Sequence, residues 1–392
     1  MAKGSRFRNN SWIAYFTMSK RKPVDEVRLL PLTIALCVTL VSACTIVVLS
    51  IYFSLTLFDV HQLKRQREIS SSDLFNMLKV AFAVVAGIGG VIALVVSYRK
   101  QRIAETVEGR ERFRLFNERF VSSSEQLGSE NPAVRLAGVY SMASLADDWT
   151  EHRQTCVDVL CAYMRIPHSA IVDSQNLDAL LESLRTTEWR AEREVRLSII
   201  RTLTERLKDS GDDDNKIGWR NLRFDFTGAL FDGGDFSSAQ FVKSEIHFDH
   251  AIFVGPTTFS TTSFIDCELH FSDARFMNSQ VIFGGAKFVR SPIWFARAKL
   301  SGGIITFVNT IFSMSGISFF QATFASGNLE FYSSEAESSL MIFDHADFQG
   351  ATLDLRGLAG STVALSLNDK GEAAVPTELR LPEEATIETS PR

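Results

Sequence analysis

Phenylalanine recurs at a regular spacing through the C-terminal half of the chain, and this repeat constrains the fold more than any other feature. Of the 31 phenylalanines in the 392 residues, 22 fall between Phe224 and Phe348. From Phe226 to Phe241 the step is five residues; afterwards steps of five and seven alternate, with one step of six after Phe253. A helix repeats every 3.6 residues or so and a strand every two, so neither element alone explains the pattern.

The spacing predicts a coil with four faces per turn, in which each face contributes one large and one small inward side chain. A small residue stands two positions before many phenylalanines, as Ala286 does before Phe288. A turn then takes about 24 residues, with coils about 4.8 Å apart. Leu300 and Ala336 occupy the two positions of the register where a phenylalanine is missing. The two extra residues of a seven-residue step are expected to bulge outward at a corner. The rings should stack in two columns: Phe248, Phe271, Phe295, Phe319 and Phe343, and Phe236, Phe259, Phe283, Phe307 and Phe331.

The Ala-x-Phe-x-x steps resemble pentapeptide repeats, as at Ala229-Leu-Phe-Asp-Gly and Ala346-Asp-Phe-Gln-Gly. The resemblance covers about a third of the chain and implies a right-handed quadrilateral β-helix over residues 222–358. The stretch from Phe116 to Tyr140 is similar to a segment that precedes such repeats in two-span actinobacterial membrane proteins, a group without an assigned activity. This chain departs from the usual repeat by using Phe almost everywhere in place of Leu.

Two long uncharged runs precede the repeat region. Residues 29–58 and 80–98 contain no charged side chain, and a helix that crosses the bilayer core needs about 20 apolar residues. The first run is too long and begins too late for a cleaved signal peptide, whose apolar stretch covers about 7–15 residues. We therefore expect a membrane α-helical hairpin over residues 29–98, with a short external loop at 59–76; a buried helix of a soluble domain is the alternative.

Lysine and arginine predict the orientation of this hairpin. Seven precede the first run, four lie between the runs and seven follow the second within 21 residues. Because basic residues concentrate on the cytoplasmic side, we expect a multi-pass plasma-membrane protein whose basic N-terminal tail (residues 1–28) and C-terminal part are both cytoplasmic. The small-residue pairs Ala83/Gly87 and Ala86/Gly90 allow close helix contact, either within the hairpin or in a homo-oligomer.

Residues 99–210 are predicted to form an α-helical stalk and an α-helical linker domain. Arg135, in an otherwise apolar helix of this domain, is expected to pair with Asp147 or Asp148. An acidic linker follows at 211–221; it lacks the ligand spacing of a calcium loop. Residues beyond the repeats are expected to form a capping segment and a flexible tail, at 359–392.

One cluster in the repeat region could hold a metal ion. His247 and His270 each precede a ladder phenylalanine, so they are expected to stack on adjacent coils, with Asp249 or Asp266 nearby. Trp294 stands at the equivalent position of the next coil, so no third histidine follows. We interpret the histidines as a solvent-facing pair and predict no metal, cofactor-binding or catalytic residue.

Enzymatic activity is not expected, because no Ser/His/Asp arrangement, phosphate-binding glycine loop or HExxH motif is present. Five scattered cysteines contain no CxxC pair, which disfavours a zinc site. A net charge of −5 disfavours direct binding of nucleic acid. The lipid bilayer and an unidentified cytoplasmic protein are the expected partners.

Three functional hypotheses follow. In the first, the chain presents its β-helix in the cytoplasm as an interaction or scaffolding surface. In the second, it is a membrane-acting stress or phage-defence effector that oligomerises through its transmembrane helices. The third rests on resemblance, because some pentapeptide-repeat proteins are acidic rods that mimic duplex DNA and occupy DNA gyrase; 14 acidic against 7 basic residues between 224 and 356 allow it.

Overall fold

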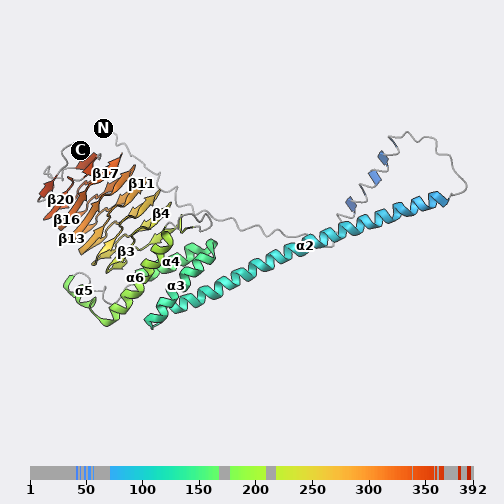
Figure 1. Ribbon diagram of the computed structural model, residues 1–392, viewed down its shortest axis with the longest axis horizontal. Helices are drawn as coiled ribbons and strands as arrows, with labels where there is room; N and C mark the ends of the chain where they lie inside the picture. The colour runs from blue at the N-terminus through green and yellow to red at the C-terminus, as the bar shows by residue number, and fades with distance from the viewer. Residues whose placement is uncertain are drawn as a thin grey trace, which may run out of the picture. The chain divides into compact units, whose positions relative to one another are not determined.

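The structure is a computed structural model that describes most of the chain (Figure 1). It divides into two compact units, residues 1–111 and 112–392, and the boundary falls within helix α2 (Ser71–Leu127). The described residues are 41–42, 45, 48–49, 52–53, 56, 71–166, 177–208, 218–337, 339–356, 358–359, 362–365, 378–380 and 386–389.

The first unit contains the uncharged run 80–98, which lies inside α2. From Leu78 onward this helix is long and apolar enough to cross a membrane, and none of its most apolar stretch is buried. Large apolar side chains such as Val80 and Leu94 are 64% and 71% exposed. The N-terminal tail, most of the run 29–58 and residues 59–70 of the expected loop lie outside the described residues. Residues 71–76, the rest of the loop expected at 59–76, are helical and form the start of α2. The pairing of the two runs in a hairpin therefore lies outside the described residues.

The second unit begins with a helical region that matches the predicted α-helical linker. Asn131 caps its first helix by accepting a hydrogen bond from the backbone N–H of Ala133, and Pro132 occupies the first turn, where its missing N–H costs nothing. Gly138 allows this helix to approach the end of α2, because a Cβ there would lie 2.6 Å from the Leu127 nitrogen. The helices are α3 (Pro132–Asp148), η2 (Thr150–His152), α4 (Arg153–Arg165), α5 (Leu177–Ser183) and α6 (Thr187–Leu207).

The prediction that Arg135 pairs with Asp147 or Asp148 is wrong. Its guanidinium lies 3.4 Å from Glu192 of α6 and donates hydrogen bonds to two backbone carbonyls of the turn before α3. Asp147 and Asp148 are at the other end of α3, and twelve helical residues span about 18 Å, which is beyond the reach of an arginine side chain. The two aspartates pair with other arginines at 2.9 and 2.8 Å, namely Arg206 and Arg119.

From residue 223 the chain forms a β-solenoid of parallel strands, and its described strands make three sheets. The first contains β1 (Arg223–Asp225), β5 (Glu245–His247), β9 (Glu268–His270), β12 (Ile293–Trp294), β15 (Ile317–Ser318), β18 (Leu340–Ile342), β22 (Thr362–Leu365) and β24 (Thr386–Thr389). The second contains β2 (Leu230–Phe231), β3 (Gly234–Asp235), β6 (Ile252–Phe253), β7 (Thr257–Thr258), β10 (Arg275–Ile282), β13 (Lys299–Val308), β16 (Thr323–Tyr332), β19 (Asp347–Phe348), β20 (Ala351–Asp354) and β23 (Glu378–Arg380). The third contains β4 (Gln240–Val242), β8 (Ser263–Ile265), β11 (Lys287–Val289), β14 (Ile311–Ser313), β17 (Ser334–Glu337) and β21 (Leu358–Ala359).

The strand register confirms the predicted turn length for most of the solenoid. Phe276 pairs with Leu300, and Leu300 pairs with Phe324, so these turns have the predicted length. The first turns are slightly shorter, as the pairing of Phe224 with Ile246 shows. The additional residues of the later turns lie at the corner between two faces of the second sheet. There β10, β13 and β16 each continue around the corner as a single strand.

The rings stack in the two predicted columns. Successive centroids in both columns lie 4.7–5.0 Å apart, and the ring planes differ by at most 12°. Leu300 and Ala336 take ring positions as expected, because Leu300 pairs with Phe276 and Phe324 while Ala336 pairs with Phe312. Burial of these rings supplies the apolar core of the solenoid.

The extra residues of the seven-residue steps do not all bulge outward. At the corner between the third and first sheets, one residue per turn points inward, and these residues form a ladder of short polar side chains. The backbone N–H of each donates to the side chain of the next: that of Cys267 to Ser291 Oγ at 3.0 Å, and that of Ser291 to Ser315 Oγ at 2.9 Å. Buried backbone donors must be paired, and the hydroxyls do this where the chain turns. The ladder is Ser244, Cys267, Ser291, Ser315 and Ser339.

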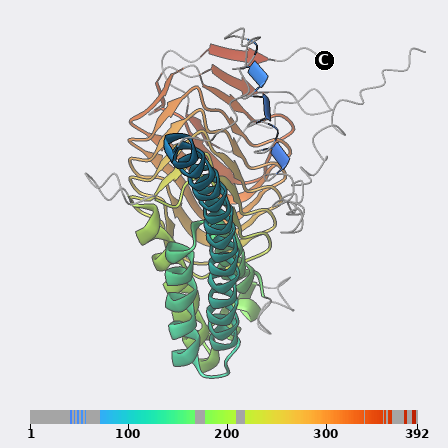
Figure 2. The ribbon, with the colours of Figure 1, turned by 90° about the vertical axis from the view of Figure 1, so that its right-hand side faces the viewer.

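Helices α4 and α6 cover the first coil of the solenoid (Figure 2). Arg165 of α4 bonds the Asp225 carboxylate of β1, and Trp189 of α6 donates to Asp232 at 2.8 Å. Thr204 donates to the carbonyl of Asp235. Solenoid ends must be covered because their last coil exposes unpaired edges and core, and the helical region does this at the N-terminal end.

Candidate functional site

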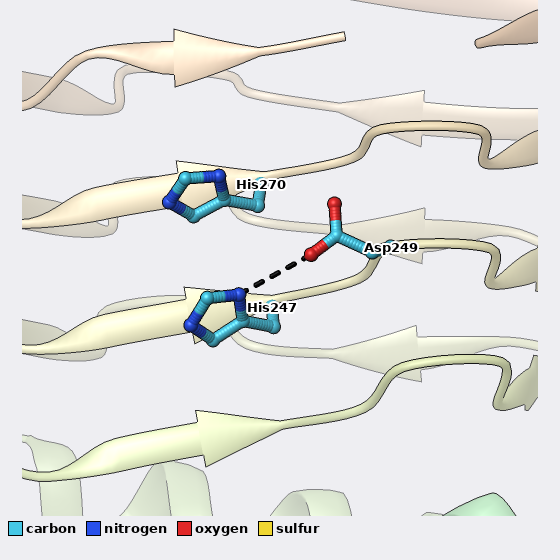
Figure 3. A group of neighbouring side chains, drawn as sticks. All are labelled: His247, Asp249 and His270. Carbon is cyan, nitrogen blue, oxygen red and sulfur yellow. Dashed lines mark hydrogen bonds and ion pairs between the residues drawn. The ribbon is translucent and has the colours of Figure 1, made fainter. Parts of the chain in front are cut away.

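Two histidines lie side by side on the outer surface of the first sheet (Figure 3). The parallel register places His247 of β5 directly against His270 of β9. Their ring centroids are 4.8 Å apart, and their planes differ by 11°. The stacking predicted from the sequence is confirmed, and Trp294 follows His270 in the same column as expected.

Asp249 joins the histidines from the corner that follows β5. One of its oxygens forms a hydrogen bond of 3.2 Å with His247 Nδ1, and the other accepts a hydrogen bond from the backbone N–H of Ser272 at 2.9 Å. Asp266 is not part of the group, because it pairs with Arg290 across another corner. We refer to His247, Asp249 and His270 as the His–Asp cluster.

The cluster has a consistent electrostatic pattern. The hydrogen bond to Asp249 raises the pKa of His247 above its ordinary value, although burial acts in the opposite direction. Burial would raise the pKa of Asp249, but the hydrogen bonds from His247 and Ser272 outweigh it and lower that pKa. The cluster therefore favours a cation beside an ionised carboxylate.

Each imidazole also faces a second carboxylate on its own strand. His270 Nε2 lies 3.3 Å from Glu268, and His247 Nε2 lies 3.8 Å from Glu245. Both glutamates stand two residues before their histidine, so they share the outward side of the strand. The sequence analysis did not predict these glutamates, although the alternation of side chains along a strand places them on the same side as the histidines.

Farther along the first sheet the outer surface becomes apolar. The exposed fractions of Trp294, Phe320 and Leu340 are 40%, 38% and 40%. Trp294 lies on β12 and Leu340 on β18, and Phe320 lies two residues beyond the end of β15, between them in strand order. We refer to these three residues as the apolar patch. The phenylalanine register did not point to it, because Phe320 directly follows Phe319 of the ladder and lies outside that register.

Arginines pair with several of the outward aspartates of the solenoid. Arg290 binds Asp266 at 2.5 and 2.9 Å, and Arg297 binds Asp273 at 3.0 and 2.6 Å. In both pairs the partners lie one full turn apart, so they link successive coils. These bidentate contacts neutralise carboxylates, whereas an acidic rod that mimics duplex DNA would need them to remain charged and unpaired.

In comparisons with known proteins, no family model, curated protein or solved structure matches this chain. The solenoid itself has about five turns of stacked parallel strands with a regular phenylalanine ladder. That architecture is consistent with pentapeptide repeats. The fold alone does not identify an activity, because function resides in the sites that a fold positions.

Proposed function

We propose that this chain is a multi-pass plasma-membrane protein that presents its β-solenoid in the cytoplasm as a binding surface for another protein, without catalysing a reaction. In this proposal the solenoid is a right-handed quadrilateral β-helix, and both termini are cytoplasmic. The extended, stacked surface of a solenoid suits it to protein interaction. The observation that carries the proposal is the apolar patch.

The apolar patch has the composition of an interaction site. Aromatic side chains are enriched at the centres of protein interfaces, where Trp contributes most to affinity. The outward neighbours of the patch in the first coils are charged, with Glu245 and Glu268 beside the histidines. A hydrophobic centre bordered by charge is the usual anatomy of an interface.

The membrane part of the proposal is supported by α2 and by the distribution of charge. Large apolar side chains in the run 80–98 of α2 are exposed, and the run 29–58 is equally free of charge. The larger numbers of Lys and Arg on the outer flanks favour cytoplasmic termini.

A topology experiment tests the orientation. In sealed inside-out vesicles, external protease should cleave the solenoid while the same protease spares it in right-side-out vesicles. Cleavage in right-side-out vesicles alone would place the solenoid outside the cytoplasm and overturn this part of the proposal.

A crosslinking experiment in native membranes tests the interaction surface. Adducts seen with the natural chain should disappear for Trp294→Ala and Leu340→Ser. They should persist for Tyr332→Ala, a control whose side chain is 41% exposed but lies on the second sheet. Identical adducts in all variants would remove the apolar patch as the binding surface.

A second candidate function is the oligomerising membrane effector. Among the described residues, nothing lies within 4 Å of a Cβ atom placed on Gly87 or Gly90, and small residues at such positions allow another helix to approach closely. Gly87→Leu should then abolish any loss of membrane potential caused by overexpression, whereas an unchanged potential with the natural chain removes this function. The DNA mimic is not proposed, because arginines pair with Asp266 and Asp273.

A further inference from the structure

We propose that the His–Asp cluster binds one divalent transition-metal ion of the Zn²⁺ and Co²⁺ class. Two imidazoles and one carboxylate form a donor set that suits these ions. The inference goes beyond the binding surface proposed above and does not depend on it. It departs from the sequence expectation, which was a solvent-facing histidine pair without a metal. Asp249, one of the two nearby carboxylates named there, approaches the histidines from the adjoining corner.

The donor atoms lie near enough to one another to coordinate a single ion. One donor atom from each of the three residues lies within 4.8 Å of the others. Zinc bonds of about 2.0–2.1 Å in a tetrahedron place ligand atoms about 3.4 Å apart, so binding requires the side chains to draw together by a distance on the order of 1 Å. The three side chains are 24–25% exposed, which leaves them room to rotate and leaves one position of the ion open to water.

The surroundings of the cluster orient its ligands. His270 Nε2 lies within hydrogen-bond distance of Glu268, so this ring can donate its Nε2–H to the carboxylate and turn its Nδ1 toward the ion. Glu245 lies 3.8 Å from His247 Nε2, close enough to favour the same orientation electrostatically. This is the carboxylate–histidine–metal arrangement that fixes the tautomer and raises ligand basicity. The remaining oxygen of Asp249 is held by the N–H of Ser272.

The backbone holds the cluster rigidly. Glu245, Ile246 and His247 pair in register with Glu268, Leu269 and His270, and the rings of Phe248 and Phe271 beneath them are fully buried. Sites on regular strands hold their ligands more precisely than sites on loops. Asp225, the neighbour of His247 in the column, is neutralised by Arg165 and Arg223, so the negative charge at the cluster comes from Asp249, Glu245 and Glu268.

Calorimetry on the full-length chain in detergent tests the proposal. The chain carries no histidine tag and is first treated with a chelator; ZnCl₂ is then titrated. We expect one Zn²⁺ per chain, with affinity at least tenfold weaker in each of His247→Gln, Asp249→Asn and His270→Gln. Glu268→Gln should weaken binding about 10–100-fold, the usual effect of removing an outer-shell partner. The matched control is His345→Gln, a histidine outside the cluster, which should bind as the natural chain does.

Two further measurements keep the test decisive. Co²⁺ should give the visible absorption of a nitrogen- and oxygen-ligated tetrahedral or five-coordinate ion, lost in the same three variants. Zn²⁺ should raise the unfolding temperature of the natural chain and of His345→Gln but not of the cluster variants, whose metal-free unfolding temperatures establish that they fold. Absence of binding to the natural chain, or equal binding by the natural chain and all cluster variants, would overturn the proposal.

Discussion

Phe283 stacks directly beneath Phe307, with ring centroids 4.7 Å apart and planes that differ by only 6°. Both rings are fully buried. The relationship repeats from coil to coil, so Phe283, like each inner ring of the column, has one stacked neighbour below and one above. Truncating one ring therefore removes two stacking contacts and leaves a cavity that its rigid neighbours cannot fill.

We predict that Phe283→Ala lowers the free energy of unfolding by about 3–5 kcal/mol, the usual cost of a Phe-to-Ala change in a core. Equilibrium denaturation of the detergent-solubilised chain measures this. The control is Phe320→Ala, whose ring is 38% exposed and whose loss should cost less than about 1 kcal/mol. Equal losses for the two variants would contradict a core built on stacked rings.

Gly303 is a position at which the solenoid leaves no room for a side chain. It has a φ of +88°, and a Cβ there would overlap the Ser279 carbonyl oxygen. Gly303→Ala should destabilise the chain by about 2–4 kcal/mol, from backbone strain together with steric overlap. Gly228 separates the two causes, because its φ is +72° but nothing lies within 4 Å of the Cβ position.

Gly228→Ala should therefore cost only the backbone term, about 1–2 kcal/mol. Thermal unfolding of both variants measures the difference. A Gly303→Ala variant as stable as Gly228→Ala would show that the coils can move apart at this corner.

Much of the solenoid could be predicted from the sequence because its inward positions carry nearly the whole signal. Large rings recur wherever the chain crosses the core, and the same register identifies Leu300 and Ala336 as ring substitutes. The inward serine ladder could not be predicted in this way, since short polar residues at a corner look like surface residues. Ser291 and Ser315 become buried because the turning backbone needs acceptors there.

The helical region and the candidate site were less predictable for a different reason. Glu192 is distant from Arg135 along the chain, and only the packing of α6 against α3 brings the two together. The histidine pair was predictable because one turn of known length separates its members. Asp249 was also named from its nearness in sequence, but its hydrogen bond to His247 depends on the geometry of the corner.

Glu192 connects three side chains between α3, α4 and α6. It accepts a hydrogen bond from the Tyr163 hydroxyl at 2.9 Å and lies 2.8 Å from Arg196 and 3.4 Å from Arg135. The Arg196 side chain is only 5% exposed, so removing its counter-charge leaves a buried cation. We predict that Glu192→Ala lowers the free energy of unfolding by about 3–5 kcal/mol.

Glu192→Gln should cost less, because the amide oxygen still accepts a hydrogen bond. Glu194→Ala is the matched control on the same helix, where an exposed side chain should change stability by less than about 0.5 kcal/mol. Chemical denaturation monitored by tryptophan fluorescence distinguishes the three. A Glu192→Ala variant no less stable than Glu194→Ala would contradict the role of this carboxylate.

The three described cysteines should be unreactive while the chain is folded. Burial raises the pKa of Cys156 and of Cys161 to about 12 and that of Cys267 to about 11, and all three side chains are buried. The thiolate is the nucleophile, so at pH 8 very little reactive form is present and the reagent has no access to it.

Iodoacetamide at pH 8 should therefore label none of the three in the native chain and all of them in guanidinium chloride, as read by mass spectrometry of the separate peptides. A variant with an added exposed thiol, Ser301→Cys, provides the internal control and should be labelled under native conditions. Rapid native labelling of Cys267 would contradict the inward ladder at the corner, because its sulfur accepts a hydrogen bond from the backbone N–H of Ser244 there. Labelling of Cys156 or Cys161 alone would instead indicate opening of the α3–α4 pair while the solenoid stays closed.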